Sequence, residues 1–318
     1  MKPTVTVSIV TPSYNQAEYL AATMESVLGQ DGEFFLDYIV IDGGSTDGSP
    51  AIIRRYQEML DRGEWKTGCS GIRFRWFSEP DDGQSDALLK GFRMAAGDIL
   101  AWLNSDDLYL PGTLRTITDF FRQFPAVAMV YGDSLYCDAA GTILGRYPAS
   151  PFDIDRLAFF NFIPQPSTFF RRTAYEAVGG LDGYLNFVMD YDLSIRIGKQ
   201  FSCRYLSLEL SHYRLHEAAK TMRDEVLFDN HEEGVRVAMK HFAWAPLNMV
   251  YGSCNHYCRK KIPAPLKRSR FLLIAASLLC TLFRSLWLNR GIDPRDFRLL
   301  SRDNLRKLFK DRREILLG

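Results

Sequence analysis

The stretch Val5-Thr6-Val7-Ser8-Ile9-Val10-Thr11-Pro12-Ser13-Tyr14-Asn15 decides how the first half of the chain folds. Its first six residues are mostly apolar or β-branched and predict a strand; a polar loop follows, and then a helical pattern at 19–30. Three further units repeat this order, with strand patterns at 38–41, 74–77 and 99–103 and helical patterns at 51–60, 85–95 and 111–124. The alternation predicts an α/β fold with a mainly parallel sheet flanked by helices.

Each predicted strand ends in a polar loop. After the first loop, at 11–15, come residues 42–48, 79–86 and 104–107, which are rich in Asp, Gly and Ser. Ligands of parallel α/β sheets bind beyond the carboxyl ends of the strands, so we expect these loops to share one site. Further strand patterns at 128–131, 167–170 and 204–208 and a helical pattern at 190–199 are expected to complete the sheet and cover the other side of the cleft.

The charge of the chain is unevenly distributed. The 318 residues have a net charge of +1, but residues 259–318 carry 16 Lys and Arg against 5 Asp and Glu. A basic tail on an acidic body indicates an anionic partner. We expect that partner to be a membrane surface and expect no nucleic acid. The sequence predicts a catalytic domain at 1–225 and a helical, basic extension at 226–318.

Within the extension, an apolar run at 271–283 ends at Arg284. Thirteen residues fall short of the roughly 20 that span a bilayer, so the run is not expected to cross a membrane. Basic residues at 259–261 and 267–270 precede it and Trp287 follows. Two interpretations stay open: a helix in the plane of a membrane surface, or a helix packed against the catalytic domain or a second subunit of a homo-oligomer.

The six cysteines are scattered through a chain too large to need disulfides, which predicts reduced thiols and a cytoplasmic protein, peripheral at the inner face of the membrane if the tail binds lipid. The strand pattern at 5–10 is unlike a signal peptide. Cys254-Asn255-His256-Tyr257-Cys258 has no second Cys/His pair at zinc-site spacing, so no zinc is expected there.

Acidic residues of two loops suggest the chemistry. Asp106 and Asp107 follow a buried strand pattern, where carboxylates can bind Mg²⁺ or Mn²⁺, although capping of the next helix is the alternative. Asp42 opens a Gly-Gly-Ser-Thr turn, where a carboxylate can accept from a ribose hydroxyl or a base N–H. The chain lacks a Gly-x4-Gly-Lys-Ser/Thr loop and a Gly-x-Gly-x-x-Gly motif, which disfavours ATPases and dinucleotide enzymes.

Together the motifs resemble family 2 glycosyltransferases, inverting sugar transferases with the GT-A fold. The resemblance spans about residues 5–220 and rests on several stretches in order: 7–15, 41–49, 83–87, 102–107, 165–169, 179–182 and 189–193. It implies a donor site built from many side chains. These are Thr11, Pro12, Tyr14 and Asn15 around the nucleotide, Asp42 on the base or ribose, and Asp82, Gln84, Ser85 and Asp86 beside the nucleotide and sugar.

The resemblance also implies a metal site at residues 104–107. Asp106 matches the second acid of the family's Asp-x-Asp motif; Ser105 stands between, and Asn104 replaces the first acid. Asn104 can hydrogen-bond a ribose hydroxyl or a metal-bound water but brings no charge. On this reading Asn104→Asp should preserve or strengthen metal binding. His216 matches the position where many relatives supply a further ligand of Mn²⁺ or Mg²⁺.

The remaining implied role is that of the base. Asp190 matches the family's catalytic Asp, which takes the proton of the acceptor hydroxyl as it attacks; Asp192 is the second candidate. The expected function is metal-assisted, inverting transfer from a nucleotide-diphosphate sugar, with UDP expected, to a glycan or lipid-linked acceptor in the biosynthesis of a cell-envelope polysaccharide. The alternative is an inactive relative that binds nucleotide or sugar as a scaffold.

Overall fold

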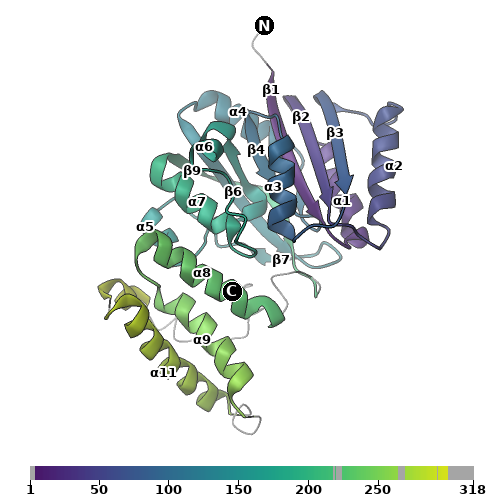
Figure 1. Ribbon diagram of the computed structural model, residues 1–318. Coiled ribbons are helices and arrows are strands. Elements are labelled where there is room, and N and C mark those ends of the chain that lie inside the picture. The colour runs from purple at the N-terminus through teal and green to yellow at the C-terminus, as the bar shows by residue number, and fades with distance from the viewer. Residues whose placement is uncertain (1–3, 218, 220–223, 264–268, 292, 300–318) are drawn as a thin grey trace. The chain divides into compact units, whose positions relative to one another are not determined.

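The structure is a computed structural model that describes residues 4–217, 219, 224–263, 269–291 and 293–299 (Figure 1). The chain divides into two compact units. The first comprises residues 1–152 and 162–214, and the second residues 153–161 and 215–318. The sequence had placed a single boundary at residue 225, whereas this division falls after Arg214 and assigns the short segment at 153–161 to the second unit.

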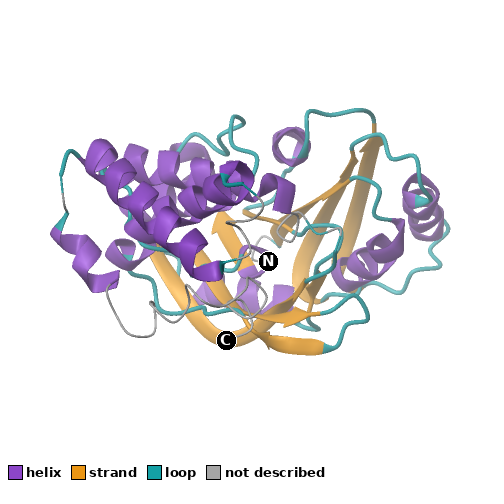
Figure 2. Ribbon diagram, turned by 90° about the horizontal axis from the view of Figure 1, so that it is seen from below, coloured by secondary structure: helices purple, strands orange, loops and turns teal. Residues whose placement is uncertain are grey.

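The first unit is built on a nine-stranded sheet, drawn in orange in Figure 2. Its parallel part has the order β3-β2-β1-β4. These strands are β1 (Val5–Ser13), β2 (Asp31–Asp42), β3 (Gly68–Ser78) and β4 (Ile99–Trp102). The helices between them are α1 (Ala17–Leu28), α2 (Ser49–Asp61) and α3 (Gln84–Met94), and α4 (Thr113–Gln123) follows them in the chain. The predicted α/β fold with a mainly parallel sheet flanked by helices is confirmed.

The other strands extend the sheet and bend it. They are β5 (Leu108–Tyr109), β6 (Val127–Cys137), β7 (Ile143–Arg146), β8 (Thr168–Arg171) and β9 (Ser202–Arg214). β8 pairs with the first half of β6, while the short strands β7 and β5 pair with the later halves of β6 and β9. The register between β6 and β9 shifts around Gly132 and Asp133. The halves of these strands before and after the shift therefore belong to different parts of the sheet.

The core lies between the sheet and its helices. Residues 7, 9, 34, 36, 38 and 40 of β1 and β2 are fully buried together with Leu20, Met24 and Val27 of α1. The predicted strand at 38–41 was too short because β2 contains acidic residues at 31, 33 and 37 that interrupt the apolar pattern. Apolar residues at 34 and 36 nevertheless bury their side chains, and one of the acids is buried with them.

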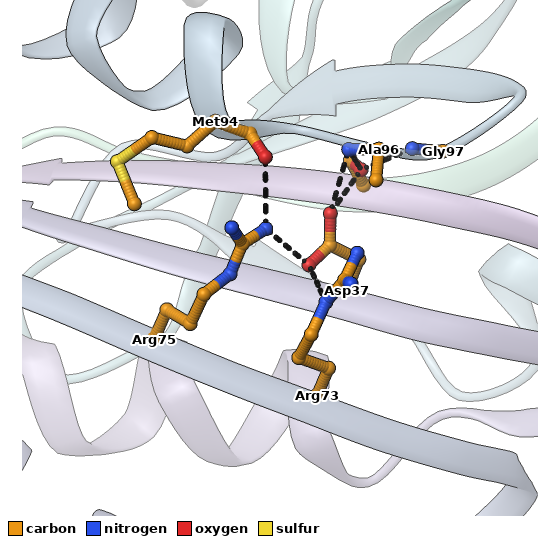
Figure 3. Close-up of polar contacts among 7 residues, drawn as sticks. Asp37, Arg73, Arg75, Met94, Ala96 and Gly97 are labelled. Carbon is orange, nitrogen blue, oxygen red and sulfur yellow. Dashed lines mark hydrogen bonds and ion pairs between the residues drawn. The ribbon is translucent and has the colours of Figure 1, made fainter.

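The buried acid is Asp37, whose carboxylate is fully enclosed (Figure 3). It accepts hydrogen bonds from Arg73 Nε at 2.9 Å and Arg75 Nη2 at 2.6 Å on β3, and from Ser8 Oγ at 2.7 Å on β1. The backbone N–H of Ala96, just after α3, donates to it at 2.9 Å. Asp37 therefore joins three strands to the C-terminal end of α3, whose N-terminal end faces the other edge of the sheet.

The second unit is helical. Its elements are α5 (Ile154–Leu157), α8 (Asp224–Phe242), α9 (Leu247–Lys261), α11 (Arg270–Asn289) and the 3₁₀ turn η3 (Pro294–Leu299). α9 packs between α8 and α11. The apolar run thus continues through Arg284 into a helix of 20 residues with a mean hydropathy of 2.0 over its most apolar 18 residues, and by length and composition alone this helix could cross a membrane. The helix is longer than the predicted run because Arg284 does not end it: Arg284 pairs with Glu232 of α8 at 2.6 Å. That the run does not cross a membrane stays a prediction.

We predict that Asp37→Asn lowers the free energy of unfolding by about 2 to 3 kcal/mol, because it leaves two arginines beside a neutral group. Burial alone would raise the pKa of Asp37, but its donors Arg73, Ser8, Ala96 and Arg75 together hold the pKa below its usual value. The carboxylate therefore stabilises the protein above the unfolded pKa of about 4, and this stabilisation is lost as the pH falls through the lower folded pKa.

Urea unfolding at neutral pH and at pH ~3 measures the effect, and the gap between wild type and variant should narrow in acid. The control is Glu58→Gln, which removes one partner of an exposed pair at 3.4 Å and should change the free energy of unfolding by less than about 0.5 kcal/mol. An Asp37→Asn protein as stable as wild type at neutral pH would contradict the assigned role.

Candidate functional site

The first two polar loops are tied to each other through Asn15. Its backbone N–H donates to Ser45 Oγ at 2.8 Å, and its side-chain oxygen accepts from the N–H of Thr46 at 2.9 Å. Asn15 has a φ of 51°, a left-handed conformation that asparagine tolerates better than most residues. The loops after β1 and β2 therefore form one joined surface at the carboxyl edge of the sheet.

The predicted nucleotide residues of the first loop lie at different depths. Thr11 is fully buried, and its hydroxyl accepts from the Tyr38 hydroxyl at 3.1 Å. Pro12 is buried as well, whereas Tyr14 is 61% exposed. Tyr14 and Asn15 are thus accessible to a ligand, and Thr11 and Pro12 support the loop from below.

Asp42 is fully buried at the end of β2 and has its oxygens occupied by protein donors. Ser45 donates from its backbone N–H at 3.0 Å and from its hydroxyl at 2.5 Å, and Ser78 Oγ donates at 2.7 Å. The carboxylate shapes the Gly-rich turn and holds it to the end of β3. Its predicted contact with a base or ribose remains a prediction.

Asp81 is a site residue that the sequence reasoning passed over in favour of Asp82. Asp82 is exposed, whereas Asp81 is partly buried and lies against Gly43, where a Cβ atom would come within 2.8 Å of its carboxylate. Burial raises the pKa of Asp81, and the nearby Asp86 and Asp42 carboxylates raise it further. The signal that could have identified it is the glycine, because a residue without Cβ leaves room for a close neighbour.

The start of α3 brings Gln84, Ser85 and Asp86 to the same edge. Gln84 Nε2 donates to Asn104 Oδ1 at 2.7 Å, and the buried Ser85 hydroxyl donates to the carbonyl of Leu185. Asp86 accepts from the N–H of Asp82 at 3.3 Å and pairs with Lys90 at 3.2 Å. Of the three, Gln84 contacts the loop that holds the predicted metal motif.

Asn104 is the centre of an amide network. Its oxygen accepts from Gln84, and its Nδ2 donates to Gln165 Oε1 at 3.1 Å and Asp107 Oδ2 at 3.3 Å. Gln165 is oriented by its own donation to the carbonyl of Trp102 at 2.8 Å. Position 104 therefore needs a donor as well as an acceptor, which an ionised Asp cannot provide. The departure from the family motif matches the chemistry of its neighbours.

Asp107 is a structural acid. It is fully buried, and its Oδ1 accepts from the N–H of Arg214 at 3.0 Å. Arg214 in turn donates from Nε to the carbonyl of Asp106 at 2.8 Å and stacks over the ring of Tyr19 at 4.9 Å. Burial, together with the charge of Asp106, raises the pKa of Asp107 well above its usual value. The pair fixes the loop after β4 to the end of β9.

Asp106 is partly exposed, whereas its neighbours Ser105 and Asp107 are buried. Mg²⁺ is commonly bound by one or two carboxylates, with substrate phosphates and waters as the other ligands, and Asp106 fits that pattern. Among the described residues no group of three His, Cys, Asp or Glu side chains could hold a metal alone. His216 is buried and belongs to the second unit, so its role as a metal ligand remains a prediction.

The two candidate bases differ in environment. Both lie in the first turn of α7 (Met189–Gln200). Asp192 is fully buried and bonded to Arg196 at 2.7 and 2.6 Å, and Arg196 also donates to the carbonyls of Val178 and Gly180 at 2.7 Å. Asp190 is partly exposed. Asp192 is therefore committed to holding the Gly179-Gly180 turn, and Asp190 is the better placed to meet an acceptor.

A cavity of about 470 Å³ lies elsewhere, lined by Phe120, Phe124, Val127 and Ser202 among others. Val127 and Ser202 begin β6 and β9, which run parallel to each other. The cavity is therefore at the amino ends of these strands, opposite the polar loops. It is not part of the candidate site.

The parallel sheet, with polar and acidic loops at its carboxyl edge and a partly exposed Asp after β4, defines the class of sugar transferases with a GT-A-type fold. The chain matches Glycosyl transferase family 2 over residues 8–173, more than half of its length, and belongs to this family. It is therefore a glycosyltransferase of class EC 2.4 that uses a nucleotide-sugar donor.

A curated relative agrees with this assignment, and solved structures share the fold. The sequence is 30% identical over 210 residues to a PGL/p-HBAD biosynthesis glycosyltransferase of Mycobacterium bovis, covering 65% of this chain and 75% of that protein. The fold is similar to that of S. aureus TarS in complex with UDP-GlcNAc (TM-score 0.59, 14% identity, 95% and 90% of the two chains). It is also similar to a Pyrobaculum calidifontis mannosyltransferase in complex with GDP-Man and Mn²⁺ (0.55, 16%, 99% and 86%).

We predict that Gly43→Ala weakens binding of the nucleotide product about tenfold, because the added methyl displaces the Asp81 carboxylate. The matched control is Gly48→Ala in the same turn, where a Cβ would meet its nearest neighbour, Ala17, at an ordinary 3.6 Å. Isothermal titration calorimetry with UDP and GDP compares the variants. Equal affinities for both variants would show that Asp81 does not shape the pocket.

The contacts of Asn104 predict that Asn104→Asp also lowers stability, whatever its effect on metal binding. A carboxylate there would face Gln165 Oε1 and Asp107 Oδ2 without a proton to share, so we predict a loss of about 1 to 2 kcal/mol in the free energy of unfolding at neutral pH. The control is Gln57→Glu, the same kind of change beside Asp61 on an exposed face of α2, which should cost less than about 0.5 kcal/mol. Urea unfolding decides, and a more stable Asn104→Asp protein would argue against the network.

Proposed function

We propose that this enzyme transfers a sugar from a UDP-sugar, with inversion, to a hydroxyl of a glycan or lipid-linked acceptor. The observation that carries the proposal is a difference in burial among the acidic residues of the candidate site. Asp42, Asp107 and Asp192 are buried and bonded within the protein, while Asp106 and Asp190 remain partly exposed. Metal-assisted, inverting transfer needs one acid near the diphosphate and one near the acceptor, and this pattern supplies both.

Asp190 is the proposed general base. In an inverting reaction the acceptor hydroxyl attacks the anomeric carbon on the face opposite the leaving diphosphate, and a carboxylate takes the hydroxyl proton as the new bond forms. The nucleoside diphosphate leaves with the electron pair of the broken C–O bond. No covalent intermediate with the protein is needed. The position of Asp190 in the first turn of α7, the turn that the Asp192–Arg196 pair holds in place, supports this role.

Asp106 is the proposed protein ligand of a divalent cation, Mn²⁺ or Mg²⁺, with His216 as a further ligand. When bound, such a cation neutralises the charge that develops on the departing diphosphate. The mannosyltransferase from Pyrobaculum calidifontis, which shares the fold, was solved with GDP-Man and Mn²⁺. Asn104 would contribute through hydrogen bonds and without charge.

The donor nucleotide and the acceptor are proposed on different grounds. TarS was solved with UDP-GlcNAc, which supports UDP, while the GDP-Man complex of the mannosyltransferase makes GDP the competing choice. A growing surface polysaccharide or lipid-linked oligosaccharide is the proposed acceptor, reached by a cytoplasmic enzyme at the inner face of the membrane. Hydrolysis and transfer assays with UDP-, GDP- and dTDP-sugars in the presence of Mn²⁺ test the donor.

A second candidate function is that of an inactive family member that binds nucleotide as a scaffold. The neutral residue at position 104 favours it, because the usual first acid of the metal motif is missing. Nucleotide binding without turnover of any donor in the same assays would support the scaffold and contradict the enzyme.

We predict that Asp106→Ala lowers the metal-dependent turnover number on the order of 100-fold or more.

Asp190→Asn should lower the turnover number on the order of 100- to 10,000-fold while affinity for the nucleotide stays near that of wild type. Steady-state kinetics with the best donor, together with UDP titrations, separates the two effects. Asp192→Asn serves as the structural comparison, because it should lower the unfolding temperature through the loss of its bonds to Arg196. A fully active Asp106→Ala or Asp190→Asn enzyme would overturn the mechanism.

A further inference from the structure

The helix α11 exposes a broad apolar face. Phe283 is 70% exposed and Trp287 78%, and the same face continues over the length of the helix with Phe271, Leu272, Leu278, Leu279, Leu282 and Leu286. Contiguous apolar patches of this kind on a water-soluble surface usually mark an interaction site. The face therefore needs an occupant.

The covered side of α11 has the opposite character. Apart from Leu273 and Ile274 near its start, the fully or nearly buried residues are small and polar: Ser277, Thr281 and Ser285. Ser277 contacts Asn255 of α9 at 3.3 Å, and Arg284 binds Glu232 of α8 with two contacts of 2.6 Å. A helix on the surface of a soluble protein normally turns its apolar residues inward. Small and hydroxyl residues toward the neighbouring helix, with large apolar residues outward, are typical of helices in contact with lipid.

The charges around the exposed face are positive. α11 contains no Asp or Glu, and it is bounded by the exposed Arg270 at its start and the exposed Arg290 after its end. α9, which packs beside it, ends in the exposed residues Arg259, Lys260 and Lys261. Such basic residues next to an apolar face favour anionic lipid headgroups.

We propose that the exposed face of α11 docks in the plane of an anionic lipid bilayer. Its aromatic and leucine side chains enter the headgroup and acyl boundary, and the flanking Arg and Lys side chains bind lipid phosphates. Trp287 is suited to that boundary, where the indole ring combines an apolar body with a hydrogen-bond donor. This docking goes beyond the proposed transfer reaction and depends on neither the donor nor the base.

Two other arrangements fit the structure less well. A spanning orientation would carry the Glu232–Arg284 pair and the neighbouring acid Glu233 of α8 toward hydrocarbon, which is costly for charged groups. A second copy of the chain seated on the same face would bring its own Arg270 and Arg290 to the interface, and α11 offers no acidic residue to pair with them. In-plane contact with lipid leaves the Glu232–Arg284 pair in place and gives the basic residues lipid phosphates as partners.

The test is co-flotation of the full chain with vesicles of phosphatidylcholine alone and of equal parts phosphatidylcholine and phosphatidylglycerol. Wild type should float with the anionic vesicles, less so in high salt.

The triple variant Leu279→Ser, Phe283→Ser, Trp287→Ser should lose this partitioning on the order of 100-fold. Lys260→Glu with Lys261→Glu should weaken binding to the anionic vesicles about tenfold or more. Quenching of tryptophan fluorescence by brominated lipid should disappear in Trp287→Phe.

The control is Ile143→Ser with Leu208→Ser, which removes two apolar side chains of the first unit that are 46% and 51% exposed and should leave flotation unchanged. Equal flotation of wild type and the triple variant would overturn the proposal. So would a wild-type dimer in sedimentation that becomes a monomer in the triple variant without any vesicle binding, because the face would then be a contact between copies. Release of the wild type from membranes only by detergent would replace in-plane docking with a spanning helix.

Discussion

The buried carboxylate of Asp107 is the constraint on which the candidate site depends. The chain passes from β4 to β5 through residues 103–107, although β8, β6 and β9 lie between these two strands in the sheet. The loop can hold this path because Asp107 accepts from the backbone of Arg214 while Arg214 binds the carbonyl of Asp106. One acid and one arginine thereby join the parallel part of the sheet to its bent part, and they leave the neighbouring Asp106 at the surface.

The opposite end of the same sheet is held by a different kind of contact. Asp37 with Arg73 and Arg75 links three strands to the end of α3, so the helix is fixed at one end by charge and presents Gln84 to the site at the other. Buried acids thus stabilise the sheet at both of its ends. The two acids proposed for function, Asp106 and Asp190, differ from these in being partly exposed, and the functional proposal rests on this difference in burial.

Much of this fold could be predicted from residue patterns, and the failures have physical causes. Four β-α units were visible because their strands and helices are long and periodic, whereas β2 was cut short at its buried Asp37, whose arginine partners lie on another strand. Motif resemblance predicted roles for Asp106 and Asp190, roles that stay predictions, and passed over Asp81 and Arg214. Their importance comes from contacts with Gly43 and Asp107, residues distant in sequence, which no local pattern reports. The helix α11 was underestimated since Arg284 reads as a terminator until Glu232 is seen beside it.

The neutral amide at position 104 has a further consequence for the order in which ligands can enter. With two acids, a motif of this type repels an incoming diphosphate until a cation has bound, because like charges at short range oppose one another. Here Asn104 carries no charge and Asp107 is buried beside Arg214, so within residues 104–107 Asp106 is the one partly exposed carboxylate. For the proposed metal site, this single exposed charge predicts that nucleotide enters before the cation as readily as after it, and that the free cation binds weakly in the absence of nucleotide.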